Sequence, residues 1–393
     1  MQTVSKLTKE QEAQQLDLVS YAFSWELSEK NQRRFGWLND HSVSYGSFAK
    51  EYLTSQVMVT PFTVNLFDTL YPMSGIGFVA SYPEYRGQGR IDELMTQIIA
   101  DCQAEGTVLS YLAPFSYPFY RRYGYELVFE RIKYQVGIQE WPDAKKVPGQ
   151  IKRVSYQAAK AVIKTIYPQL AKNHQGGVVR EDWWLDYKFC MRKDYTYAIY
   201  QDELGVPQGY LIYLINDGKL LVQEMNYLHH TAYKALNRFI ASHNGSVSEV
   251  IYEEGYTGEN LQFHLATPFA QFFVRPEMMV RVVDVLAFLE RFPFEKIAQA
   301  FGIKIRPDKY APWNEGVYEV SHEQGEPSIK KVTTSRLPLV EMDVQQFVQL
   351  FFGYKKATEL AFHEKIVGDE TALVTLNEVI PQTNRKPTLE DYF

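Results

Sequence analysis

A glycine-containing turn joins a predicted strand to a predicted helix in the first quarter of the chain. Residues 75–80 are apolar and partly β-branched, which indicates a strand, and residues 94–100 have apolar side chains at helical spacing. Between them, residues 86–89 read Arg-Gly-Gln-Gly. The first N–H groups of a helix have no partner within the helix, and glycine lets the backbone approach a ligand closely. Residues 81–95 therefore predict an anion site, and we expect it to hold a pyrophosphate.

Two common phosphate-binding motifs do not fit this turn. A P-loop needs Lys and then Ser or Thr after its last glycine, whereas Gly89 is followed by Arg90 and Ile91. A dinucleotide fingerprint needs a third glycine at the position of Asp92. The pattern that remains is Arg-x-x-Gly, preceded by Pro83 and two tyrosines. It resembles the coenzyme A loop of the GNAT superfamily of N-acetyltransferases.

A second motif follows the next predicted strand, residues 107–113. Residues 119–126 read Phe-Tyr-Arg-Arg-Tyr-Gly-Tyr-Glu, an aromatic pair followed after a short gap by Gly-Tyr. This order resembles the other GNAT signature, in which a tyrosine protonates the thiolate of departing coenzyme A. The resemblance gives that role to Tyr120. The chain has 28 tyrosines, most of which are expected to pack in cores or cap surfaces.

Composition limits the compartments and partners that we expect. The 393 residues suffice for two or three domains, and the net charge of −6 argues against nucleic-acid binding, which needs a basic surface. Cys102 and Cys190 lie at neither a metal-ligand nor a redox spacing, so we expect free thiols, no metal and a cytoplasmic protein. The N-terminus lacks an apolar signal region, and no apolar run approaches about 20 residues, so no membrane association is expected.

The first part of the chain is predicted to contain a mixed sheet. Residues 1–7 are expected to form an edge strand, 11–25 a helix, and 31–40 a loop or short helix. Alternating apolar residues over 41–80 indicate a run of antiparallel strands. Pro, Lys and Gly are enriched over 141–150, where we place a domain boundary.

The remaining chain is predicted to contain two further α/β parts. The second part repeats the order of the first without another Arg-Gly-Gln-Gly turn, with strands at 195–200, 209–215, 220–227 and 247–252 and helices at 158–167 and 231–243. The third part has predicted helices at 285–292, 294–301 and 343–351 and strands at 316–320 and 328–332. It opens on Met-Val-Arg-Val-Val-Asp at residues 279–284.

This arrangement resembles, over essentially the full chain, the acetyltransferases of the enhanced intracellular survival (Eis) type. The resemblance implies an α+β fold of two tandem GNAT-like mixed-sheet domains, a catalytic one over 1–145 and a degenerate one over 146–280. A sterol-carrier-like α+β domain would follow over 281–393. The resemblance also implies a homo-oligomer, which is a hexamer in that family.

The same resemblance implies the residues of an acetyl-transfer site. It gives Tyr120 the role of general acid, and it gives the C-terminal carboxylate of Phe393 the role of general base. The family often has two arginines where Gly87 and Gln88 stand, so pyrophosphate contact is expected to depend on Arg86, Arg90 and backbone groups. The residues expected to bind coenzyme A are Val79, Ala80, Ser81, Arg86, Gly87, Gln88, Gly89, Arg90, Ile91, Asp92, Phe115 and Ser116.

These inferences predict an acetyl-CoA-dependent N-acetyltransferase that acts on a primary amine. The resemblance implies an aminoglycoside, a lysine side chain or another small amine, and the residues do not choose among them. The alternative is a protein that binds a lipid or small apolar ligand in its last domain and keeps a non-catalytic GNAT scaffold. Acetyl-CoA should stabilise the folded enzyme but not this alternative.

Other aromatic and histidine residues are expected to be structural. Trp25, Glu26, Phe35 and Trp37 have the chemistry to line an amine pocket, but ordinary packing of rings and a solvated carboxylate are the better prediction. His229 and His230 have no third ligand at a suitable spacing, which favours a loop before the next helix over a metal site.

Overall fold

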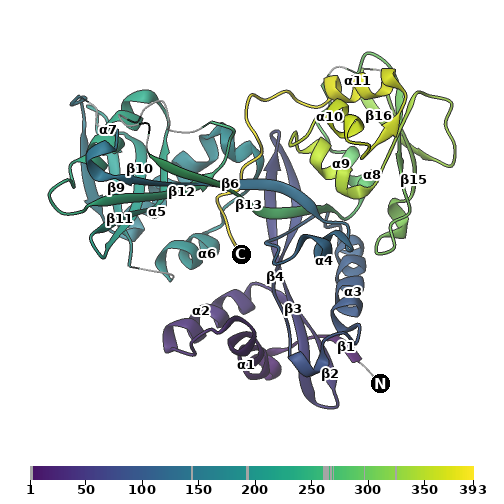
Figure 1. The fold of residues 1–393 in the computed structure, drawn as a ribbon, viewed down its shortest axis with the longest axis horizontal. Helices are drawn as coiled ribbons and strands as arrows, with labels where there is room; N and C mark the ends of the chain where they lie inside the picture. The colour runs from purple at the N-terminus through teal and green to yellow at the C-terminus, as the bar shows by residue number, and fades with distance from the viewer. Residues whose placement is uncertain are drawn as a thin grey trace. The chain divides into compact units, whose positions relative to one another are not determined.

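A computed structural model describes residues 3–142, 145–191, 194–259, 265, 268, 270–295, 297–323 and 325–393. The chain forms two compact units, and each is described here by itself (Figure 1). The first unit comprises Met1–Val128, Glu277–Asn384 and Asp391–Phe393, and the second comprises Phe129–Pro276 and Arg385–Glu390. The predicted domain limits at 145/146 and 280/281 stay predictions, because one compact unit can hold more than one domain.

The first unit begins with a mixed sheet in the order β1-β2-β3-β4-β5-β13. Its strands are β1 (Thr3–Lys6), β2 (Val43–Ala49), β3 (Tyr52–Leu66), β4 (Thr69–Ser81), β5 (Leu109–Leu112) and the last part of β13 (Gln271–Val282). Only β4 and β5 are parallel to each other. The helices are α1 (Glu12–Phe23), α2 (Glu29–Asp40), α3 (Arg90–Ala104) and α4 (Tyr117–Arg121). The predicted edge strand and the antiparallel strands over 41–80 are confirmed.

Helix α3 connects the parallel strands β4 and β5 and packs along the sheet (Figure 1). Its apolar side chains recur on one face and are buried, namely Leu94, Met95, Ile98, Ile99 and Cys102. Burying a Leu, Ile or Met side chain stabilises a fold by about 1.5–3 kcal/mol. This face therefore fixes α3 on the sheet and sets the position of its N-terminus at the end of β4.

Strands β4 and β5 pair over a short distance and then separate. The pairing runs from Met73 with Leu109 to Ile76 with Leu112, where β5 ends, while β4 continues to Ser81. Beyond that point β4 has a bulge, because Met58 of β3 pairs with Gly77 while Gln56 pairs with Ala80. A bulge bends its strand and changes the direction of side chains and backbone groups. We call the diverging ends of β4 and β5 the fork.

The last part of the first unit contains a second sheet in the order β16-β15-β14-β17-β18. Its strands are β14 (Phe301–Ile305), β15 (Gly316–Glu323), β16 (Glu326–Val332), β17 (Leu339–Met342) and β18 (Val367–Gly368). Its helices are α8 (Val285–Leu289), α9 (Val344–Phe351), α10 (Ala357–Phe362) and α11 (Glu370–Val379).

The helix predicted over 294–301 is wrong. The described residues of this segment form no helix, and Phe301 begins β14, the central strand of the second sheet. Pro293 limits the backbone here, and the backbone N–H of Glu295 donates to the carbonyl of Val379 at 2.7 Å. Tertiary contacts have therefore overridden a short apolar pattern that also fits a helix.

The second unit contains a sheet in the order β6-β12-β11-β10-β9-β7. Its strands are β6 (Glu126–Gly137), β7 (Gln150–Val154), β9 (Thr196–Gln201), β10 (Pro207–Asn216), β11 (Lys219–Tyr227) and β12 (Glu249–Gly255), and β8 spans Gln175–Val178. The helices are α5 (Tyr156–Ile166), α6 (Asp182–Leu185) and α7 (His230–Ala241). Strands β11 and β12 are parallel and α7 lies between them in the chain, so β11-α7-β12 repeats the order β4-α3-β5.

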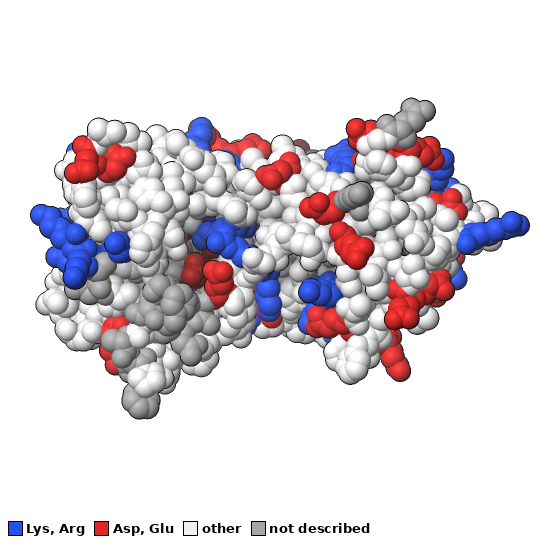
Figure 2. Space-filling view, turned by 90° about the horizontal axis from the view of Figure 1, so that it is seen from above, with Lys and Arg blue, Asp and Glu red and all other residues white. Residues whose placement is uncertain are grey.

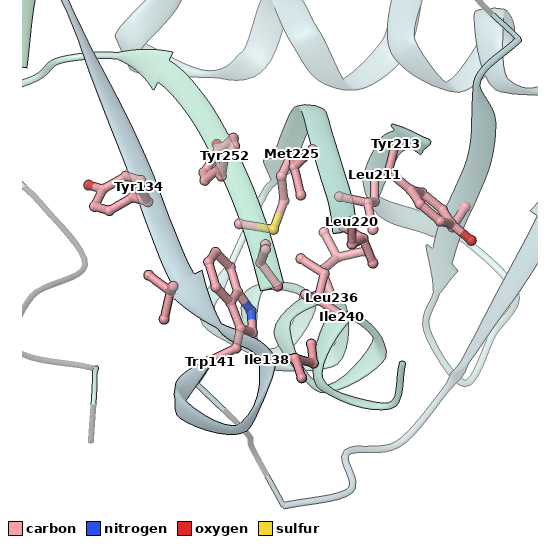
Figure 3. Close-up of a cluster of buried hydrophobic side chains, with 14 of the residues drawn as sticks. Tyr134, Ile138, Trp141, Leu211, Tyr213, Leu220, Met225, Leu236, Ile240 and Tyr252 are labelled. Atoms are coloured by element: carbon pink, nitrogen blue, oxygen red, sulfur yellow. The ribbon is translucent and has the colours of Figure 1, made fainter. Parts of the chain in front are cut away.

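One buried hydrophobic cluster of the second unit lies between its sheet and α7, and another contains buried residues of α5. Trp141, Leu211, Leu220, Leu236 and Ile240 pack together in the first of these clusters (Figure 3). The Trp141 indole donates a hydrogen bond to the Asn237 side chain at 3.0 Å, which satisfies its polar atom inside this core.

Charged side chains occur in small separate groups of both signs on the face of the molecule in Figure 2. Among the described residues on that face, no continuous basic stripe is visible.

Candidate active site

The turn between β4 and α3 is shaped by two glycines. Gly87 has φ +75° and Gly89 has φ +79°, values that favour glycine, and a Cβ at either position would meet no atom within 4 Å. The positive φ values, and not a lack of space for a side chain, therefore explain why glycine stands at both positions. Gly89 is the N-cap residue of α3, and no side chain caps this end of the helix. The first N–H groups of α3 thus have no side-chain cap, which is compatible with the predicted anion site, and that site stays a prediction.

Two predicted coenzyme contacts, Arg86 and Gln88, lie exposed on this turn. Arg86 Nε donates to the carbonyl of Ser81 at 3.3 Å, and Gln88 Nε2 donates to the carbonyl of Glu84 at 3.0 Å. Both hydrogen bonds join a side chain of the turn to a backbone carbonyl four or five residues earlier in the chain. The terminal nitrogens of the Arg86 guanidinium form no hydrogen bond with any residue that the structure describes.

Three further predicted contacts occupy the first turn of α3. Arg90 is buried, and its guanidinium donates to Ser47 Oγ at 3.0 Å. Ile91 packs against the apolar cluster beneath α3. Asp92 accepts a hydrogen bond from the Tyr310 hydroxyl at 2.5 Å. Since these side chains are used within the unit, their backbone N–H groups are the parts best placed for a ligand.

The predicted residues Val79, Ala80 and Ser81 lie on the β4 side of the fork, beyond its pairing with β5. Ala80 is buried, and Ser81 Oγ shares a hydrogen bond with Ser55 Oγ at 2.7 Å. Extended backbone that leaves a sheet ladder can pair with an extended ligand. This edge therefore suits a flexible chain that carries amide groups.

Phe78, in the bulge, is a candidate site residue that the sequence reasoning missed. Its φ is +45°, a strained value for a bulky residue, and such strain often marks functional sites. Its ring lies 5.9 Å from that of Trp25 and 5.6 Å from that of Phe35. No sequence signal identifies this conformation. Trp25 and Phe35, both predicted to be structural, thus lie next to the bulge. Trp37 packs instead against His41, with ring centroids 5.4 Å apart.

The predicted general acid, Tyr120, lies on α4, which follows β5 after the predicted contacts Phe115 and Ser116. The Tyr120 side chain is only 2% exposed, and its ring packs against Phe115 at 5.3 Å. Its hydroxyl forms no hydrogen bond with the described part of the chain. Burial raises the pKa of Tyr120, and the neighbouring Tyr125, Tyr123 and Tyr392 raise it further. The phenol therefore stays protonated at neutral pH and carries the proton that a general acid must have.

The C-terminal residue is seated on β4. The Phe393 ring lies 5.0 Å from the Phe62 ring, and a Cβ built at Gly75 would be 2.6 Å from Phe393 Cδ2. A Cβ built at Gly77 would be 3.7 Å from the carboxyl carbon of Phe393. The terminal carboxylate thus lies over Gly77, directly after the last β4–β5 pair. Tyr392, the residue before Phe393, is one of the groups that raise the pKa of Tyr120.

Gly75→Ala is expected to unseat the terminal phenylalanine. The new Cβ would overlap the Phe393 ring, and overpacking of this kind destabilises a fold by about 1–3 kcal/mol. We expect a lower free energy of unfolding in urea and faster release of Phe393 by a carboxypeptidase. Gly77→Ala is the matched control, since its Cβ would make only ordinary contacts. Equal release rates in both variants would contradict this seat.

Neither a metal centre nor a membrane span is found within the described ranges. No group of three or more His, Cys, Asp or Glu side chains is arranged there to hold a metal ion. His229 instead caps α7, with its Nδ1 accepting from the N–H of Ala232 at 3.2 Å. None of the described helices has both the length and the apolar character that crossing a bilayer requires.

Family models match most of the chain. Residues 3–128 match an acetyltransferase (GNAT) domain, residues 176–282 match a second acetyltransferase (GNAT) domain, and residues 285–390 match a sterol carrier protein domain. The predicted fold class is therefore confirmed: α+β, with two tandem GNAT-like domains followed by a sterol-carrier-like domain.

Solved structures resemble the chain over its whole length. A protein from Enterococcus faecalis V583, described as a conserved protein of unknown function and "Probable N-Acyltransferase", is 44% identical, with a TM-score of 0.95 and 100% of both chains covered. A GCN5-related N-acetyltransferase from Anabaena variabilis ATCC 29413 is 18% identical with a TM-score of 0.88, and Eis1 from Mycobacterium abscessus is 17% identical with a TM-score of 0.80, again over 100% of both chains. At these lower identities the likeness is one of fold. No curated protein matches the chain.

Proposed function

The chain belongs to the family of GNAT acetyltransferases, and we propose that it transfers an acetyl group from acetyl-CoA to a primary amine at the fork of β4 and β5. The observation that carries this proposal is the position of the chain end. The Phe393 carboxylate lies over Gly77, and Tyr392 lies close enough to raise the pKa of Tyr120. These observations support the assignment of the Phe393 carboxylate as the proton acceptor and of Tyr120 as the proton donor.

The shape of the β4–α3 turn supports acetyl-CoA as the acetyl donor. The uncapped N-terminus of α3 and the open space around Gly87 and Gly89 suit a pyrophosphate. Arg86 is the exposed cation beside it, and the backbone of residues 79–81 would pair with the pantetheine amides. Acetyl-CoA supplies the thioester, and the protein supplies binding, orientation and proton transfer.

Two proton transfers are assigned to residues of this chain. The amine must lose a proton before it attacks, and an alkyl amine has a pKa of about 10 whereas an α-carboxyl has one of about 3.5 in water. Burial of a bound amine lowers its pKa, and we assign the Phe393 carboxylate as the group that accepts its proton, directly or through one water. As the new C–N bond forms and the C–S bond breaks, Tyr120 donates its proton to the sulfur. Backbone N–H groups at the bulge would stabilise the charge that develops on the carbonyl oxygen.

The Eis-type resemblance extends this proposal without choosing a substrate. Aminoglycosides, lysine side chains and other small amines are all consistent with a carboxylate that orients an ammonium group. A cytoplasmic homo-oligomer is part of the same proposal. A lipid-binding protein with an inactive GNAT scaffold is less favoured, because such a scaffold would not need a buried Tyr120 whose hydroxyl forms no hydrogen bond with the described residues.

Acetyl-CoA is expected to raise the melting temperature of the protein. A ligand at 100 times its Kd stabilises the folded state by about 2.7 kcal/mol. Arg86→Ala should weaken binding by roughly 10–100-fold, because a charge-assisted hydrogen bond contributes about 1.5–3 kcal/mol. Arg153→Ala removes an equally exposed arginine from the second unit and should bind as the wild type does. No thermal shift at saturating acetyl-CoA would exclude the proposed donor.

A further inference from the structure

The second unit has a cavity of about 550 Å³ at the ends of two parallel strands. It is lined by Tyr134 of β6 and by the ends of β11 and β12 and the first turn of α7, which include Asn226, Tyr227, Tyr233 and Glu254. Ligands of α/β proteins commonly bind outside the carboxyl ends of parallel strands. The volume is sufficient for a small organic molecule.

In β11-α7-β12 this cavity lies where β4-α3-β5 has the glycine turn that is predicted to bind coenzyme A. Its residues suit another kind of ligand. The β11–α7 connection has no glycine, and the His229 side chain caps α7 by accepting from the N–H of Ala232 at 3.2 Å. A pyrophosphate would compete with this cap. The cations that line the cavity, Lys172 and Arg385, both have partners within the fold, and Lys172 lies 3.3 Å from Glu390 Oε1. A phosphate ligand is therefore disfavoured.

Two acceptor oxygens of the lining residues have no donor among the residues that the structure describes. Glu254 uses only Oε2, which accepts from the Tyr252 hydroxyl at 2.7 Å and lies 3.8 Å from Lys172 Nζ. Its Oε1 has neither a hydrogen bond nor an ion pair with the described residues. Asn226 is 1% exposed, and its Oδ1 has no hydrogen-bond partner among them either. A ligand that satisfies these atoms must donate hydrogen bonds.

Charge and aromatic rings favour a cationic donor. Burial raises the pKa of Glu254, and Lys172 offsets only part of this effect, so a further positive charge would stabilise its ionised form. The rings of Tyr227 and Tyr233 lie 5.0 Å apart at the cavity, and aromatic faces attract ammonium groups. The Tyr134 hydroxyl points away from the labelled apolar side chains of the core (Figure 3).

We propose that this cavity binds a protonated primary amine, whose N–H groups donate to Glu254 Oε1 and Asn226 Oδ1 beside the faces of Tyr227 and Tyr233. This is a second amine site, distinct from the acetyl-transfer fork, and the described residues that line it all belong to the second unit. It goes beyond the proposed function, because it requires neither acetyl-CoA nor Tyr120.

The methyl group of Met225 reports on this cavity directly. Met225 lines the cavity, and the chain has 9 methionines, so ¹³C-methyl methionine spectra of the full chain are simple and Met225→Leu assigns the resonance. n-Butylammonium chloride at pH 7 should shift the Met225 signal saturably, since an alkyl amine with a pKa of about 10 is protonated there. Uncharged 1-butanol should give no saturable shift. Tetramethylammonium, which has no N–H, should bind at least tenfold more weakly.

Substitutions of lining residues test whether the Met225 shift arises from binding in this cavity. Glu254→Gln should weaken n-butylammonium binding at least tenfold, and Tyr233→Leu, which keeps Glu254, should weaken it about threefold. Glu253→Gln is the matched control, because the neighbouring Glu253 does not line the cavity and pairs with Arg275 at 3.3 Å. An unshifted Met225 signal, an equal response to 1-butanol or tetramethylammonium, or wild-type affinity in both cavity variants would overturn the proposal. These spectra are recorded without acetyl-CoA, so their outcome is independent of acetyl transfer.

Discussion

Tyr120→Phe should reduce kcat for thiol release from acetyl-CoA by roughly 10²–10³-fold, with nearly unchanged coenzyme binding. The substitution removes only a hydroxyl, and this hydroxyl forms no hydrogen bond with the described residues, so the fold loses little. The loss arises because the sulfur must then leave as a thiolate without a proton donor. Initial rates with a thiol reagent measure kcat, and the thermal shift with acetyl-CoA measures binding.

Tyr125→Phe is the matched control for this experiment. Tyr125 is also buried, its ring lies 6.3 Å from that of Tyr120, and its hydroxyl shares a hydrogen bond with Ser110 Oγ at 2.7 Å. Its loss should cost about 1 kcal/mol of stability while kcat stays within a few-fold of wild type. If Tyr120→Phe turns over as fast as the wild type, Tyr120 is not the general acid.

Adding one glycine after Phe393 should lower kcat by roughly 10²-fold or more. The extension converts the Phe393 carboxylate into an amide and moves the new carboxylate by up to about 3.8 Å. Either change removes the proton acceptor from its place over Gly77. The same thiol-release assay measures the effect, at an amine concentration well above the KM of the wild type.

Phe393→Leu tests the role of the terminal carboxylate independently of the role of the phenylalanine ring. This variant keeps the terminal carboxylate but loses the aromatic contact with Phe62, so kcat should fall far less than in the extended chain. Full activity of the extended chain would show that the carboxylate is not the base.

The local parts of the first GNAT domain could be predicted from the sequence. The glycine turn, α3 and the position of Tyr120 each depend on residues that are neighbours in the chain. Helix periodicity identified α3. Arg90 excluded a P-loop and Asp92 excluded a dinucleotide fingerprint, which left the GNAT-like coenzyme A loop as the type of phosphate site. The roles of Tyr120 and Phe393 came from family resemblance, and no sequence pattern predicts that Phe393 packs against Gly75.

Features that depend on distant contacts could not be predicted in this way. The last residues of β13, Met279–Val282, pair with β5 beside the fork, although the whole second GNAT-like part separates them in the chain. The helical pattern at 294–301 gave way to β14, whose two neighbouring strands decide its conformation. The positive φ of Phe78 depends on the bulge opposite β3, and such strain persists only when surrounding structure imposes it.

A crystal structure of the chain with coenzyme A tests the central claim most directly, through the distance from the thiol sulfur to the Tyr120 hydroxyl. We predict a pyrophosphate at the N-terminus of α3 and a sulfur within about 3.5 Å of the Tyr120 hydroxyl oxygen, directly or through one water. A coenzyme bound elsewhere, or a sulfur more than roughly 8 Å from this oxygen, would contradict the account.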